Sequence, residues 1–256
     1  MTSRESRARL WWEIVIVLAL SLGMSALYSI VRIIERLTRD TALSQQKAPI
    51  NVSLDPRPAF DLAFQLLGFV SELAPVALVV FLLWSNARPH LSRLGLGRVA
   101  ENQGWIRESG RGLLLAAVIG IPGIAFYLGA KAIGINTTVV PTELDAYWWT
   151  VPILVLQALR AALSEELIVV AYLFDRLKRL GLGPWAVIMS SALLRGTYHL
   201  YQGFGGFAGN VIMGVVFGWA YHRWGRALPL VVAHWILDIV SFAGYPLARA
   251  LFPTLF

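Results

Sequence analysis

Residues 163–176 read LSEELIVVAYLFDR, and the adjacent glutamates Glu165 and Glu166 open a run of eight uncharged residues within it. Carboxylates are rare and costly inside an apolar helix, where they usually pair with other polar groups and mark a functional site. Whether this pair indicates a functional site therefore depends on whether the stretch lies in water or in lipid. The composition of the whole chain indicates which environment it has.

The composition is that of a membrane protein. The chain has 256 residues, of which 57% are hydrophobic and 14% charged, far from the values of soluble domains. A membrane helix needs about 20 apolar residues. The predicted fold is an all-α, polytopic transmembrane helical bundle of about seven membrane helices, with the C-terminal segment YPLARALFPTLF as a candidate eighth. The seven apolar stretches lie roughly at 11–34, 60–84, 111–134, 147–174, 184–203, 207–222 and 227–244. The first lacks a small-residue cleavage site, so a retained helix is expected rather than a signal peptide.

The basic residues predict an orientation. They gather in alternate polar segments: before the first apolar stretch, between the second and third, after the fourth and after the sixth. Because lysine and arginine are enriched on the cytoplasmic side, the N-terminus is expected to be cytoplasmic. The net charge of +7 then follows from topology and attraction to lipid headgroups, and no nucleic-acid partner is expected. The expected location is the cell membrane, as a multi-pass protein, with a bacterial cytoplasmic membrane favoured.

The longest polar connections divide the chain. They lie at 35–58 and 85–110, so the predicted organisation is a segment of N-terminal membrane helices and connections over 1–110, followed by a helical core over 111–256. The chain has no cysteine, which excludes disulfides, thiolate metal sites and a cysteine nucleophile. An inverted repeat, typical of many secondary transporters, is not evident.

Polar residues recur inside three of the apolar stretches. Burying such groups unpaired costs several kcal/mol, so they are expected to face one another across the bundle rather than the lipid. They are Arg160, Glu165 and Glu166 in the fourth stretch, Arg195 and His199 in the fifth, and His234 and Asp238 in the seventh.

The spacing of these residues indicates a possible chemistry. His234 and Asp238 are four positions apart, so they share one helix face, whereas Glu165 and Glu166 diverge by about 100° and only one of them is expected to aim at the cluster. A carboxylate base for water, with imidazoles to bind a metal or an oxyanion, is what amide hydrolysis requires. A structural polar network and an ion path remain as alternative interpretations.

The order of these residues resembles a known family. A Glu-Glu pair, a histidine near the end of the next helix, and a histidine followed four residues later by Asn or Asp are typical of the CAAX prenyl endopeptidase and bacteriocin-processing proteases, the CPBP or Abi family. The resemblance covers roughly 111–244. Its most specific part is the stretch 197–238, TYHLYQGFGGFAGNVIMGVVFGWAYHRWGRALPLVVAHWILD.

The resemblance implies an intramembrane endopeptidase that hydrolyses a peptide bond of a membrane-associated protein or peptide, with a catalytic core over 111–256. The family is usually described as metal-dependent, although direct action of the glutamate has been argued. By resemblance, Glu165 activates water with support from Glu166. His199 holds that water or a metal, and His234 and Asp238 bind the oxyanion or complete the metal site. The candidate ligands of a divalent metal such as zinc are Glu165, His199 and His234.

Two positions depart from the family pattern. Val170 stands where the first motif has arginine, and Arg195 stands where the second motif has an aromatic residue. We hypothesise that Arg195 supplies, from the neighbouring helix, the cation that the missing arginine would have given Glu166. The same departures favour an alternative, a non-proteolytic scaffold or a bacteriocin-immunity or regulatory membrane protein. A transporter that uses these charges as a relay is the third interpretation.

Overall fold

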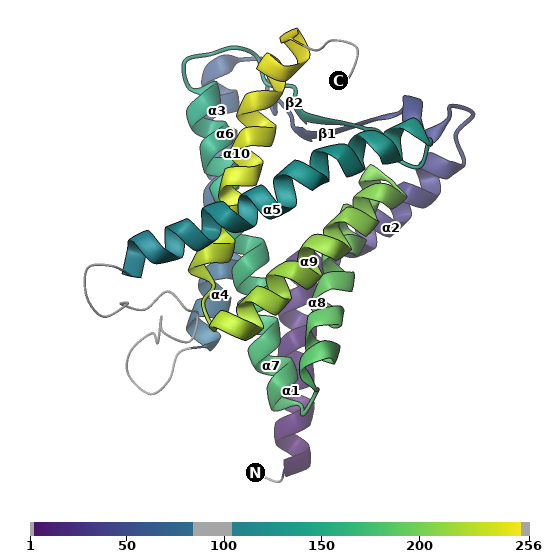
Figure 1. Cartoon of the computed structure of the whole chain (residues 1–256). Coiled ribbons are helices and arrows are strands. Elements are labelled where there is room, and N and C mark those ends of the chain that lie inside the picture. The colour runs from purple at the N-terminus through teal and green to yellow at the C-terminus, as the bar shows by residue number, and fades with distance from the viewer. Residues whose placement is uncertain (1–2, 84–103, 252–256) are drawn as a thin grey trace.

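The chain forms a helical bundle with one small parallel β-ribbon (Figure 1). This computed structural model describes residues 3–83 and 104–251. The elements in chain order are α1 (Ser3–Ala19), α2 (Leu22–Leu37), η1 (Leu43–Gln45), β1 (Lys47–Asn51), α3 (Pro58–Glu72), α4 (Ala74–Leu82), α5 (Gly104–Ala132), β2 (Thr138–Thr142), α6 (Thr150–Ser164), the π-helical η2 (Glu165–Tyr172), α7 (Leu173–Arg179), α8 (Pro184–His199), η3 (Leu200–Gln202), α9 (Phe204–Trp224) and α10 (Leu228–Leu251). The prediction of a mostly helical fold is confirmed, and most of the arginine-rich connection 85–110 lies outside the described residues.

The predicted number of membrane helices is wrong. Within the described residues, four helical segments are long and apolar enough to cross a membrane, or five if the bent pair α1–α2 is one span. The four are Pro58–Leu82, Ile106–Ala132, Phe204–Trp224 and Leu228–Pro246. Residues up to 251 of the candidate eighth element simply continue α10.

The two surplus predictions fail for identifiable reasons. α8 has 16 residues and is about 24 Å long, which is shorter than a hydrocarbon core of about 30 Å. The fourth apolar stretch folds as α6, η2 and α7, and it carries the charges of the polar cluster in its middle. Hydrophobicity alone therefore predicted two membrane spans that are not present. The residues of these segments largely fill the interior of the bundle.

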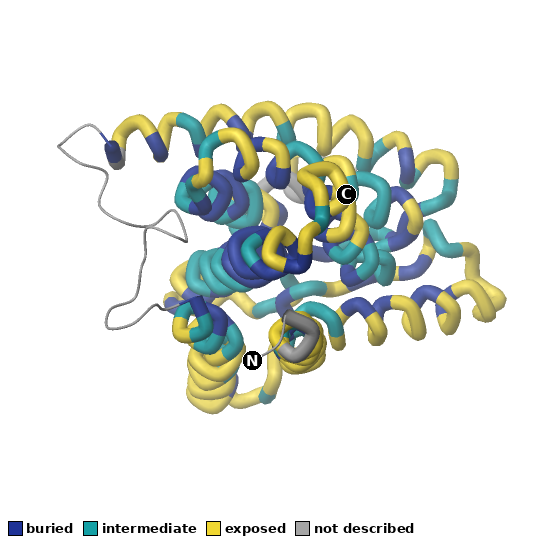
Figure 2. Tube along the Cα trace, turned by 90° about the horizontal axis from the view of Figure 1, so that it is seen from below, coloured by how far each residue is buried: buried dark blue, intermediate teal, exposed yellow. Residues whose placement is uncertain are grey.

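The outer face of the bundle is apolar. Leu27, Val31 and Leu67 are each about two-thirds exposed, and Ile121 is 74% exposed. Figure 2 shows exposed residues along the outward faces of the peripheral helices, while buried residues gather towards the centre. A soluble protein rarely exposes so much contiguous apolar surface, so this face fits a lipid environment.

The centre of the bundle is η2, all eight residues of which are buried. Beside it, α8 and α9 pack closely against each other because glycines at their contact carry no Cβ. A Cβ on Gly214 would lie 2.7 Å from the Cα of Ala192, and one on Gly196 would lie 2.5 Å from a methyl of Val211. Such small-residue contacts let membrane helices approach closely, and they hold α8 against α9.

The β-ribbon fixes the end of α8. β1 and β2 pair in parallel, and the backbone of Thr137, just before β2, donates to the carbonyl of Gln202 with an N–O distance of 2.9 Å. Gly203 then turns the chain with φ at +108°, and a Cβ there would lie 2.5 Å from the carbonyl oxygen of Ile135. Only glycine fits this turn, which leads directly from η3 into α9.

Candidate active site

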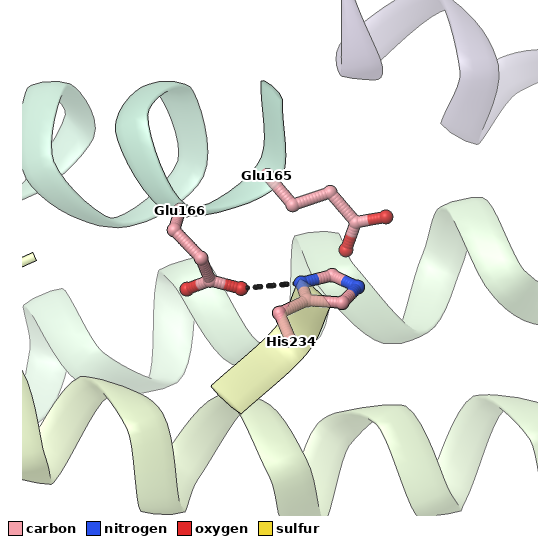
Figure 3. A group of neighbouring side chains, drawn as sticks. All are labelled: Glu165, Glu166 and His234. Carbon is pink, nitrogen blue, oxygen red and sulfur yellow. Dashed lines mark hydrogen bonds and ion pairs between the residues drawn. The ribbon is translucent and has the colours of Figure 1, made fainter. Parts of the chain in front are cut away.

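The adjacent glutamates begin the π-helical segment. Glu165 and Glu166 follow the last residue of α6, and both are buried, at 7% and 0% exposure. π-helical turns occur mostly as short segments within α-helices and are frequent at functional sites. In Figure 3 the two carboxylates approach the ring of His234 from different sides.

Arg195 links the two glutamates from α8. Its Nη2 lies 2.5 Å from Oε1 of Glu166, and its Nη1 lies 3.1 Å from Oε2 of Glu165. The side chain is fully buried. The contact predicted between Arg195 and Glu166 is thus present, but the expectation that only one glutamate faces the cluster is wrong. The planar guanidinium has donors on several edges, so a single arginine reaches both carboxylates despite their divergence.

His234 completes the cluster from α10. Its Nδ1 lies 2.8 Å from Oε1 of Glu166, as Figure 3 shows, and its Nε2 lies 3.5 Å from Oδ2 of Asp238. A carboxylate accepts hydrogen bonds, so Nδ1 donates to Glu166 in this arrangement. Both ring nitrogens of His234 thus face carboxylates, and the four-residue spacing to Asp238 brings the two together as predicted.

His199 lies at the last position of α8. Its Nδ1 lies 3.1 Å from the carbonyl oxygen of Arg195 in its own helix, and its ring centre is 4.8 Å from that of Tyr198. Bonding Nδ1 to the backbone orients the ring and leaves Nε2 as the nitrogen for a water or another ligand. The structure therefore places His199 beside the cluster, but its described hydrogen bond goes to its own helix.

Tyr198 is a residue of the cluster that was not predicted from the sequence. Its hydroxyl donates to Oε2 of Glu165 over 2.7 Å, and the side chain is 5% exposed. Oε2 of Glu165 therefore accepts from Tyr198 as well as facing Arg195. The signal was available in the sequence, because Tyr198 follows Arg195 by three positions and shares its helix face.

Arg160 belongs to a different network. It pairs with Glu72 of α3, and its Nε donates to Gln157 over 2.7 Å. Gln157 in turn donates to Gln65, which donates to the buried Asp61. These side chains join α6 to α3, so the expectation that Arg160 shares the glutamate cluster is replaced by a separate polar link.

A cavity of about 440 Å³ lies where three irregular segments meet. These are the bend between α1 and α2, the break between α3 and α4, and the start of η2. Irregular backbone inside a membrane is tolerated only where protein or a cavity covers it. The cavity is lined by Leu20, Ser21, Leu22, Ser25, Ser71, Glu72, Pro75, Arg160, Ser164 and Ile168. It thus reaches Ser164, directly beside Glu165 in the chain.

The spacing of the donors is compatible with a metal ion. Glu165, Glu166 and His234 each offer a ligand atom, all within 4.8 Å of one another. Oε2 of Glu166 is buried without a hydrogen-bond partner among the described residues. This group contains Glu166 in place of His199, the ligand that the family resemblance implied. The charge fits less well, because Arg195 already contacts both carboxylates.

The fold and this cluster define a multi-helix membrane protein with a buried carboxylate–imidazole–guanidinium site. The comparison with known families agrees: the family model for Rce1-like type II CAAX prenyl endopeptidases matches residues 147–240. This segment forms a domain of that CAAX protease family, and it contains every residue of the cluster. No curated protein and no solved structure matches the chain.

Proposed function

We propose that the protein is an intramembrane endopeptidase that hydrolyses a peptide bond of a membrane-associated protein or peptide. The observation that carries this proposal is the buried set Glu165, Glu166 and His234 within the segment that matches the protease family. Burial of three ionisable groups in a membrane bundle is costly, and hydrolysis offers a reason to retain them.

The water-activating group in this mechanism is Glu165. Its described hydrogen bond and ion pair both involve Oε2, which leaves Oε1 to accept a proton from water. The hydroxide formed attacks the substrate carbonyl carbon, and the C–N bond breaks when the amine takes that proton from Glu165. Arg195 and Tyr198 hold the carboxylate in place during both transfers.

The histidines take the remaining roles. We assign His199 to positioning the water through Nε2, because Nδ1 is bonded to the backbone of Arg195. We assign His234 to stabilising the oxyanion that forms on the substrate carbonyl. Nδ1 is bonded to Glu166 at 2.8 Å, so the donor is Nε2, whose contact with Asp238 is longer, at 3.5 Å. These steps use side chains alone, because a metal at the same carboxylates would have to displace Arg195.

The catalytic core is proposed to include α5. Gly112 lies close to Val232 of α10, and Gly120 lies close to Leu237, so α5 packs tightly along the helix that carries His234. The proposed division at residue 110 falls within α5, and the start of that helix is a better physical boundary. We further propose a cytoplasmic N-terminus and a bacterial cytoplasmic membrane as the location.

The test is cleavage by the purified protein in liposomes. The probes are quenched fluorescent peptides anchored by a prenylated C-terminal CAAX cysteine or by a transmembrane helix, with products identified by mass spectrometry. Glu165→Gln should lower cleavage about 10²- to 10⁴-fold, as expected for the loss of a general base. Glu143→Gln, at a residue just after β2, is the matched control and should leave cleavage unchanged.

Equal cleavage by wild type and Glu165→Gln would contradict the proposed role. Absence of cleavage by folded wild type on both probe types would favour the non-proteolytic alternative, a scaffold or a bacteriocin-immunity or regulatory protein. The observation that favours this alternative is the contact of Arg195 with both carboxylates, because a purely structural ion-pair network would have the same arrangement. Proton or solute flux in the same liposomes would instead indicate a transporter.

A further inference from the structure

Arg195 contacts two of the three residues whose donor atoms could hold a metal ion, Glu165 and Glu166. The guanidinium contacts one oxygen of each glutamate, at 3.1 and 2.5 Å, and the side chain has no exposed surface. Aromatic and thioether groups close over it, because the ring centre of Phe217 lies 5.6 Å from its Cζ and Sδ of Met213 lies 4.0 Å from Nη1. Arg195 is thus enclosed together with the carboxylates it pairs with.

One oxygen of Glu166 contacts both Arg195 and His234. Oε1 of Glu166 lies 2.5 Å from Arg195 and 2.8 Å from Nδ1 of His234. A divalent ion bound by Glu165, Glu166 and His234 would need a lone pair on one ring nitrogen of His234. Nδ1 now faces Glu166 and Nε2 faces Asp238. It would also lie beside a fixed positive charge that arginine does not lose, because its guanidinium stays protonated in proteins. In a low-dielectric interior this repulsion is weakly screened.

We propose that Arg195 is the resident cation of this cluster and that it keeps divalent metal ions out of the Glu165–Glu166–His234 site. The donor set is that of a zinc site, two carboxylates and an imidazole within 4.8 Å, and what it lacks is a vacant position for positive charge. Removing the charge of Arg195 while keeping its volume should therefore convert the cluster into a metal site. This goes beyond the proposed function, since metal content is measured without substrate.

The experiment compares wild type, Glu166→Gln, Arg195→Lys, Arg195→Met and the double variant Arg195→Met, Glu166→Gln. Each is purified in detergent without a histidine tag, incubated with excess zinc, desalted over a weak chelator and analysed by elemental mass spectrometry. We expect about one zinc per chain in Arg195→Met and at least about tenfold less in wild type, since three or four donors form a stable zinc site. Arg195→Lys keeps a cation and should resemble wild type.

The double variant identifies the site. It lacks one of the three donors, so it should lose the zinc of Arg195→Met, whereas zinc held by surface residues such as His222 would remain. A second readout is thermal unfolding, in which added zinc should raise the midpoint of Arg195→Met but not of wild type, because a ligand stabilises the state that binds it.

Two results would overturn the proposal. One is a stoichiometric zinc in wild type that Glu166→Gln removes, which remains decisive even if Arg195→Met does not fold. The other is an Arg195→Met protein that elutes as a single helical species and binds no more zinc than wild type. Neither result bears on cleavage, so a failure here is distinguishable from a failure of the proposed endopeptidase activity.

Discussion

At the residue scale, Arg195 is the permanently charged group that contacts both carboxylates of the site. It is fully buried and pairs with two buried carboxylates. Removing one partner of a buried ion pair leaves an uncompensated charge, which costs about 3–5 kcal/mol. Arg195→Met should therefore lower the free energy of unfolding by about that amount in metal-free buffer, measured by thermal or SDS-induced unfolding in detergent.

The matched control is Arg57→Met. Arg57 also pairs with a carboxylate, Asp55 at 2.9 Å, but its side chain is 65% exposed in the connection before α3. Exposed pairs contribute about 0–1 kcal/mol, so this variant should unfold nearly as wild type does. Equal stability of Arg195→Met and wild type would mean that the cluster does not need its guanidinium.

Tyr198 gives a second prediction at this scale. Tyr198→Phe removes one donor from Oε2 of Glu165 while Arg195 remains in contact with that oxygen. A hydrogen bond to a charged group is worth about 1.5–3 kcal/mol, so kcat should fall by about tenfold or more if Glu165 is the base. Because Tyr198 positions the base and does not bind substrate in this mechanism, KM should stay unchanged. A rise in KM at constant kcat would instead place Tyr198 in substrate binding.

At the scale of elements, the approach of α8 to α9 positions the site. A Cβ on Gly214 would lie 2.7 Å from the Cα of Ala192 and 3.4 Å from the Cδ of Arg195. Gly214→Val should push the helices apart, destabilise the protein by about 1–3 kcal/mol through overpacking, and reduce cleavage together with stability. Gly209→Ala on the same helix is the control, because a Cβ added there would lie 3.4 Å from the nearest atom, on the ring of Phe126, which is an ordinary contact. Loss of stability in both variants to the same degree would exclude the close contact as the cause.

The elements also show what the sequence can and cannot predict. Polar residues in apolar stretches correctly predicted that Glu165, Glu166, Arg195 and His234 meet, because each would be costly alone in lipid. Helical spacing found the pair His234 and Asp238. It failed for Arg160, because its partner Glu72 lies on α3 and spacing within one helix does not show which helix packs beside α6. It also failed for the adjacent glutamates. Their side chains are long and begin a π-helical segment, so the ideal angle of about 100° between neighbouring residues does not keep them apart.

At the scale of the whole molecule, the apolar composition and the long apolar stretches predicted the membrane environment but not the number of crossings. The helices α6 and α8 lie in apolar stretches of the sequence but have only 15 and 16 residues. Packing, not hydropathy, shows that they fill the interior. The bend between α1 and α2, at 57°, and the β-ribbon depend on contacts between distant segments, so local sequence does not reveal them.

Topology offers a prediction at this scale. The start of α1 and the end of α10 lie at opposite ends of the molecule (Figure 1). Because the chain has no cysteine, single cysteines can be introduced without background. In intact cells a membrane-impermeant maleimide should label Ser53→Cys but not Lys178→Cys, since the basic end of α7 is expected in the cytoplasm. Labelling of Lys178→Cys alone would reverse the orientation.

The π-helical segment η2 also sets the rotation of α7 relative to α6 about their common helix axis. A π-helical turn contains an extra residue relative to an α-helix, so deleting Val169 would favour a regular helix from α6 into α7. The shortened helix would keep its hydropathy, yet α7 would be rotated by about 100° against the glutamates. Arg176, now 2.7 Å from Glu13 and 2.8 Å from the carbonyl of Leu82, would then face away from both. Insertions and deletions in this segment are therefore far less tolerable than substitutions by other apolar residues.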